Sequence, residues 1–131
     1  METLYWPSTV ASAFVPLIFG ALWYSKGLYQ LLTGENPGSR KHKPLTYVLC
    51  VVFSIPLAMI IGGIMIGHGA EEQTAIHGGQ HGVLLGLFAI LPVMLIHFSF
   101  EGDRTIRNMM YHILYWVLSL GLMGLVIGGF C

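Results

Sequence analysis

Three of the chain's six histidines lie close together in the sequence, with acidic residues between them. His77 and His81 are four residues apart, so on a helix their rings share one face and can bind a single ion. Imidazole suits Zn²⁺ and Cu²⁺, and zinc also accepts a carboxylate. The ligands that this pattern predicts for a metal site are His68, Glu72, His77 and His81. The alternative is that these histidines lie at a membrane interface and hydrogen-bond water or lipid head groups.

Polar residues also recur in the otherwise apolar stretch 106–130, at spacings of four, three and four. This spacing places them on one face of a helix. Two further polar residues lie at the end of the preceding apolar segment and just after it. Together they define a candidate ligand site or polar path made of His97, Glu101, Asn108, His112, Tyr115 and Ser119.

Two histidines of this polar path carry the chemistry that it could support. If His97 and His112 lie at similar depth, they can pair, share a proton with Glu101, or ligate a haem. The alternative is ordinary hydrogen bonding between helices. Because polar groups in hydrocarbon need partners, we expect His112 to face other helices, within one water of His97 or of a backbone carbonyl freed by Pro92.

The composition indicates the environment in which these residues lie. Hydrophobic residues make up 55% of the chain, charged residues make up 9%, and the mean hydropathy is +0.72. Soluble domains carry about a quarter charged residues. Four segments, at about 4–24, 45–67, 77–99 and 106–130, are apolar and long enough to cross a bilayer. The sequence predicts one domain over 1–131, an all-α integral membrane protein with four transmembrane helices in an antiparallel bundle.

The positions of the basic residues predict the orientation of this bundle. All of them fall in the first and third connections or at the start of the fourth segment, which four spans place on one side. The positive-inside rule makes that side cytoplasmic. We therefore expect both termini to be extracytoplasmic in a multi-pass protein of the plasma (inner) membrane. The net charge of zero gives no reason to expect nucleic acid as a partner. The basic residues are Lys26, Arg40, Lys41, Lys43, Arg104 and Arg107.

Two features predict departures from four straight helices. Pro16, Pro56 and Pro92 interrupt the first three segments, and an interior proline leaves a backbone carbonyl without its helical partner. After the first segment, residues 26–33 place three leucines on one face. This pattern predicts a short helix that lies along the membrane surface.

Glycines on the last two segments predict where helices pack most closely. Gly78, Gly82 and Gly86 follow one another at intervals of four, and Gly124 and Gly128 show the same interval. Small residues at this spacing let two helix backbones approach each other in a membrane. We expect these glycines to form a contact between helices.

A short motif at the end of the first segment resembles a known family. Trp23, Tyr24 and Ser25 match the family's Trp-Tyr-Ser hallmark, although its usual continuation with proline and Leu-Phe-Gly is replaced here. Other similar positions are His81-Gly82, Gly86-Leu87, Phe100-Glu101-Gly102, Tyr111-His112 and Met123-Gly124. The chain thus resembles the small bacterial membrane proteins of the domain of unknown function seventeen sixty-one. The resemblance implies this architecture and assigns no activity.

No enzyme motif stands out in the sequence. It contains no nucleophile elbow, no HExxH and no Gly-rich phosphate loop. We therefore expect a non-enzymatic structural or accessory protein of the lipid bilayer, in a homo-oligomer or as a subunit of a larger membrane complex, without a cofactor. The first alternative is a small transporter or channel along the polar path. The second is a membrane enzyme or redox subunit that uses the histidines with a transition metal or haem.

Overall fold

Every regular element in the described part of the chain is a helix. The computed structural model describes residues 6–35, 44–103 and 105–130. Four helical spans are long and apolar enough to cross a membrane: Trp6–Trp23, Pro44–Ile66, Ala75–Glu101 and Ile106–Gly129. The predicted all-α fold with four spans is therefore confirmed, with bounds close to those expected.

The first span consists of two helices joined at Phe14. They are α1 (Trp6–Ala13) and α2 (Val15–Trp23), and Pro16 lies in the first turn of α2. Proline is tolerated there because the first N–H groups of a helix have no partner within it. The break therefore lies where the sequence indicates it.

The third span contains a wider turn before its proline. It runs through α5 (Ala75–Leu85), the π-helix η2 (Gly86–Ile90) and α6 (Leu91–Glu101), with Pro92 in the first turn of α6. The backbone N–H of Leu91 donates to the Gly86 carbonyl, five residues back. Pro56 has no such effect, because α4 (Pro44–Ile66) continues through it as one helix.

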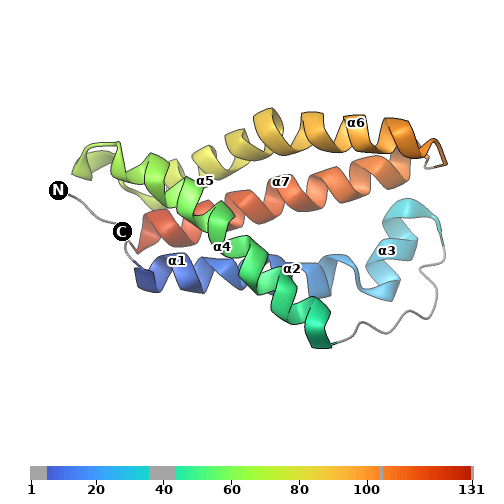
Figure 1. Cartoon of the computed structure of the whole chain (residues 1–131), viewed down its shortest axis with the longest axis horizontal. Coiled ribbons are helices and arrows are strands. Elements are labelled where there is room, and N and C mark those ends of the chain that lie inside the picture. The colour runs from blue at the N-terminus through green and yellow to red at the C-terminus, as the bar shows by residue number, and fades with distance from the viewer. Residues whose placement is uncertain (1–5, 36–43, 104, 131) are drawn as a thin grey trace.

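The last helix, α7 (Ile106–Gly129), is the core of the bundle. A larger share of it is buried than of any other span, and helices from each of the other spans contact it. Ala58, Ile61 and Met65 of α4 pack on its apolar side. Figure 1 shows α4 crossing the bundle obliquely, whereas α5 and α6 run alongside α7. The end of α7 lies near the start of α1, so both are at one end of the bundle (Figure 1).

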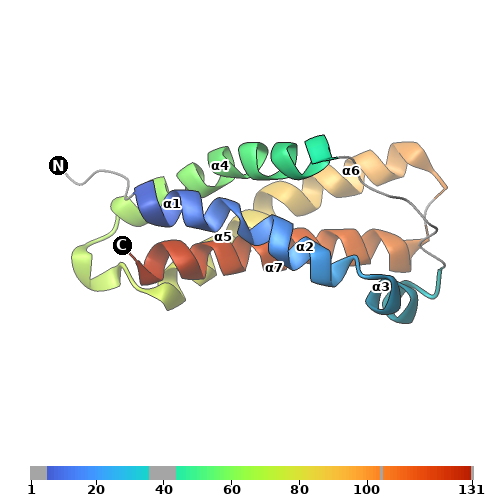
Figure 2. The same ribbon diagram turned by 90° about the horizontal axis from the view of Figure 1, so that it is seen from below.

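The short helix α3 (Lys26–Thr33) lies at the opposite end, where α7 begins (Figure 2). Its bounds are those of the surface helix expected from the sequence. It stops at Gly34, whose φ of 72° is the left-handed conformation that favours glycine at the end of a helix. After Glu35 the next described residue is Pro44, where α4 begins. A 3-10 turn, η1 (Ala70–Glu72), lies between α4 and α5.

The glycine face expected on the third span lies against α7. A Cβ atom added to Gly78 would overlap the Gly124 carbonyl, and one added to Gly82 would overlap the Leu120 carbonyl. The same holds for Gly128 against the Thr74 carbonyl, while Gly86 lies against Val117. We call this contact between α5 and α7 the glycine seam. It brings the two backbones as close as helices can pack.

Candidate functional site

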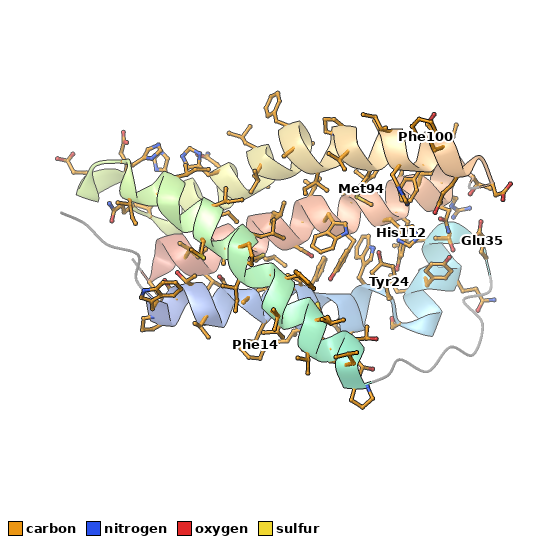
Figure 3. The ribbon with its side chains drawn as sticks, viewed as in Figure 1. Phe14, Tyr24, Glu35, Met94, Phe100 and His112 are labelled. Carbon is orange, nitrogen blue, oxygen red and sulfur yellow. The ribbon has the colours of Figure 1, made fainter. Side chains whose placement is uncertain are left out.

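The polar stripe of α7 faces α2 and α3, where it meets aromatic and acidic side chains. We call this group the aromatic–polar cluster. Figure 3 shows Tyr24 and His112 beside one another, with Glu35 at the α3 end of the same region. The members of the aromatic–polar cluster are Trp23, Tyr24, Tyr29, Glu35, Asn108, Tyr111, His112 and Tyr115.

Asn108 joins α7 to the end of α3. Its side chain is 4% exposed, and Nδ2 donates to the Tyr29 hydroxyl at 2.9 Å and to Glu35 Oε2 at 3.0 Å. Thr105 caps α7 by accepting from the Asn108 backbone N–H at 3.2 Å, and its own hydroxyl donates to Glu35 Oε1 at 3.4 Å. The Glu35 carboxylate therefore lies at the N-terminus of α7, where the helix dipole favours negative charge.

Arg107, in the first turn of α7, contacts the C-terminal end of α3. Its guanidinium donates to the backbone carbonyls of Leu31 and Leu32 in the last turn of α3. These carbonyls have no partner within the helix, and a cation at a helix C-terminus is favourable. Glu35 and Arg107 thus fasten α3 to the start of α7 by opposite charges at opposite helix ends.

Tyr24 and His112 form the hydrogen bond nearest the middle of the stripe. The Tyr24 hydroxyl lies 2.7 Å from His112 Nδ1, and the two rings stack with centroids 5.4 Å apart. The expectation that His112 meets a polar partner inside the bundle agrees with this bond. The bond runs to α2, however, whereas the sequence favoured His97 or a carbonyl near Pro92. A phenol and an imidazole in contact can hold a hydrogen bond or pass a proton.

Trp23 and Tyr111 bond each other twice. The indole N–H of Trp23 donates to the Tyr111 carbonyl at 3.1 Å, and the Tyr111 hydroxyl donates to the Trp23 carbonyl. Their rings stack at 4.9 Å. Buried indole and phenol groups need such partners, and each residue here supplies both a donor and an acceptor.

Tyr115 and Ser119 continue the stripe toward the middle of the bundle. The Tyr115 hydroxyl donates to the Pro16 carbonyl, and its ring stacks on Phe19 at 5.7 Å. Gly20 gives this hydroxyl room, because a Cβ atom there would lie 2.9 Å from it. The Ser119 Oγ is buried close to the Tyr115 side chain and has no hydrogen bond of standard geometry with a described residue.

His97 and Glu101 do not lie on this face. His97 Nε2 is 3.4 Å from Glu101 Oε1 on the surface of α6, and the two side chains are 66% and 35% exposed. The rings of His97 and His112 each lie near Phe98, with centroids 5.6 Å and 6.1 Å from its ring. Four of the six residues expected on the polar path thus share the buried face of α7. The geometry adds no support for haem between the two histidines.

The residues expected to bind metal lie at the other end of the bundle, between α4 and α5. His68 Nε2 and His81 Nε2 are 3.1 Å apart, and the ring of His77 lies just over 6 Å from both, centroid to centroid. Glu72 is exposed on η1. As placed, no three His, Cys, Asp or Glu side chains of the described ranges are grouped closely enough to hold an ion. The four-residue metal site stays a prediction.

An open apolar groove runs along the outside of the glycine seam. Its volume is about 670 Å³. Small residues at Gly79 and Gly121 form its floor, and no residue of the polar path lines it. The remaining lining residues are Ile76, Gln80, Val83, Leu84, Leu118, Leu122 and Leu125. In a bilayer such a surface faces acyl chains.

Sequence reasoning named only three of the eight members of the aromatic–polar cluster as site residues. Trp23, Tyr24 and Tyr111 drew notice through the short motifs of the family resemblance, and Tyr29 and Glu35 were not selected at all. Tyr29 follows Tyr24 by five residues in the next helix, so no single helical period connects them. One signal could have found Glu35. It is an acidic residue directly after Gly34, the glycine that ends the short surface helix, and its connection is expected on the same side of the membrane as the start of the fourth segment.

The four apolar spans around a buried polar helix face define this chain as a multi-pass membrane protein. The family model described as protein of unknown function DUF1761 matches residues 8–128, so the chain belongs to this family. The family expected from the Trp23-Tyr24-Ser25 motif is thereby confirmed. No curated protein and no solved structure matches the chain.

Proposed function

We propose that the protein is a structural or accessory membrane protein that works as a homo-oligomer. The observation that carries the proposal is that the polar side chains on α7 are engaged in hydrogen bonds with neighbouring parts of the chain. Asn108, His112 and Tyr115 each hydrogen-bond a residue of the first span or of the connection after it. Side chains committed to such bonds hold helices together and leave no continuous row of polar groups for a solute.

Exposed glycines near the C-terminal end of α4 support self-association. Ala58 and Gly62 are buried inside the bundle, whereas Gly63 is exposed and a Cβ atom there would contact nothing. Gly67 follows four residues later, in the turn just past the end of α4, and is also exposed. Exposed small residues four apart are the usual means by which membrane helices of two subunits approach.

We also propose that the protein lies in the plasma (inner) membrane of a bacterium. In this orientation α3 and the start of α7 are on the cytoplasmic side. The support is that every Lys and Arg of the sequence falls in the first or third connection or at the start of the fourth span, together with the positive-inside rule. The start of α1 and the end of α7 share the opposite end of the bundle, so the proposal places both on the extracytoplasmic side (Figure 1).

One observation favours the transporter alternative. The Ser119 hydroxyl is buried without a hydrogen bond of standard geometry to a described residue, and the Tyr24–His112 pair lies on the same face of α7. A proton path along this face would need water between these groups. The two functions differ in what purified protein does in a closed vesicle.

The test combines mass and flux on the same preparation. We expect native mass spectrometry from lipid nanodiscs to give a multiple of the 14.4 kDa chain, and proteoliposomes to show no proton flux. Gly63→Leu should shift the mass toward the monomer, whereas Ile60→Leu, at an exposed neighbouring position, should leave it unchanged. A monomeric wild type would overturn the proposal, and proton flux that His112→Gln abolishes would favour the transporter.

A further inference from the structure

Three histidines gather where α4 ends and α5 begins, away from the aromatic–polar cluster. His68 follows the last turn of α4, and His77 and His81 lie one turn apart on α5. The His68 and His81 rings have centroids 4.5 Å apart, and His77 lies 6.3 Å and 6.4 Å from them. All three side chains are partly accessible, so an ion can reach them from the surface.

One hydrogen bond determines which nitrogen of His68 is available. His68 Nδ1 lies 2.9 Å from the Ile64 carbonyl oxygen, which can only accept a hydrogen bond. Nδ1 therefore carries the proton, and Nε2 of the neutral ring presents its lone pair. A ring N–H donated to a backbone carbonyl is the usual arrangement behind a metal-binding histidine, because it fixes the tautomer and the ring orientation.

The free nitrogen of His68 points at the equivalent nitrogen of His81. The two Nε2 atoms are 3.1 Å apart. Two imidazole nitrogens that bind one tetrahedral Zn²⁺ at about 2.0–2.1 Å are separated by roughly 3.3 Å. The observed spacing is thus close to that of two ligands on one ion. It also fits a hydrogen bond in which His81 Nε2–H donates to His68.

The backbone around the pair is held in place on both sides. The His68 N–H donates to the Met65 carbonyl at 3.1 Å, and the Gln73 side chain donates to the His68 carbonyl at 3.1 Å. Thr74 caps α5 by accepting from the His77 N–H at 3.3 Å. The ring of His68 is therefore positioned by three bonds, and that of His81 by a capped helix.

We propose that His68 and His81 bind a divalent transition-metal ion of the Zn²⁺ class through their Nε2 atoms. Water completes the coordination, and His77 becomes a third ligand when its ring turns toward the pair. The inference does not rest on the proposed structural role. A bound ion would join the end of α4 to the start of α5 and so stabilise this connection.

The experiment is titration of the intact protein with Zn²⁺. The chain is purified in detergent through a histidine-free tag, treated with a chelator and studied by isothermal titration calorimetry. We expect one ion per chain, with affinity lowered roughly tenfold or more by His68→Gln or His81→Gln. His77→Gln should weaken binding less. His97→Gln is the matched control, because this histidine is exposed at the other end of the bundle, and it should bind as wild type.

A second measurement, thermal unfolding, distinguishes loss of Zn²⁺ binding from misfolding of a variant. Zn²⁺ should raise the thermal unfolding temperature of the wild type and of His97→Gln. Absence of Zn²⁺ binding by the folded wild type would overturn the proposal and leave a histidine–histidine hydrogen bond. Equal binding by a folded His68→Gln/His81→Gln double variant would overturn it as well.

Discussion

The two buried faces of α7 hold the bundle together in opposite ways. Toward α5, glycines remove side chains so that backbones touch, and the contact depends on the absence of atoms. Toward α2 and α3, large aromatic and polar side chains fill the space and bond one another. In a bilayer, where burial of apolar surface gives no advantage between helices, close packing and hydrogen bonds are what remain. The glycine seam should therefore be intolerant of any added atom, and the aromatic–polar cluster tolerant of single losses.

The largest effect is expected at the centre of the glycine seam. Gly82→Ala should lower the free energy of unfolding by about 3 kcal/mol, because the new Cβ atom overlaps the Leu120 carbonyl and must push the helices apart. The control is Gly27→Ala, in an open position on α3, which should be neutral or slightly stabilising as is usual for this change in a helix. Denaturation in mixed detergent measures both. A Gly82→Ala variant as stable as wild type would remove the distinction between the two faces.

A smaller loss is expected within the aromatic–polar cluster. Tyr111→Phe keeps the stacked ring but removes the hydroxyl that donates to the Trp23 carbonyl, so we expect a loss of about 1 kcal/mol. Met110→Leu, at the exposed neighbouring position, should have no measurable effect. The same unfolding assay applies. A loss equal to that of Gly82→Ala would mean that the two faces do not differ in tolerance.

Loss of the contact between Arg107 and the end of α3 should destabilise α3 alone. Arg107→Gln removes the cation from the carbonyls that end α3, which we expect to cost about 0.5 kcal/mol and to speed amide hydrogen exchange in α3 alone. Asp103→Asn, at an exposed site in the turn before α7, is the control. Faster exchange throughout α7 would show that this contact supports the whole bundle.

The smallest effect is expected at His112. Glutamine can still bond the Tyr24 hydroxyl, so His112→Gln should change the unfolding free energy by only about 0.3 kcal/mol, less than the roughly 0.6 kcal/mol that such a bond contributes on average in a membrane. Oligomer mass should be unchanged. If the variant assembles normally but loses a proton flux that the wild type has, the face is a path and not a packing surface.

The sequence predicts most of the fold because apolar length and the spacing of small residues and prolines act through simple physics. Span bounds follow from the thickness of hydrocarbon, and the glycine seam follows from intervals of four at Gly78, Gly82 and Gly86. The helix break beside Pro16 follows from the missing N–H. Each of these features depends on residues close together in the chain.

The partners of the polar stripe could not be predicted in the same way. Sequence proximity favoured the third span as the neighbour of His112, but His97 lies on the outer side of α6 and Tyr24 occupies the place beside the imidazole. Tyr24 is 88 residues away in the chain. Which helix covers which face of α7 is decided by the packing of all four spans, and no local pattern encodes it. The same reason explains why Glu35 at the start of α7 was missed.

The central claim is that the stripe on α7 is used in bonds to the first span, and a double-mutant cycle tests it most directly. Tyr24→Phe, His112→Leu and the double variant are compared with wild type by unfolding in mixed detergent. If the two side chains bond, their effects are coupled by about 0.6 kcal/mol and the double variant is less affected than the sum. Strictly additive effects would contradict the account, because they would mean that Tyr24 and His112 do not stabilise each other.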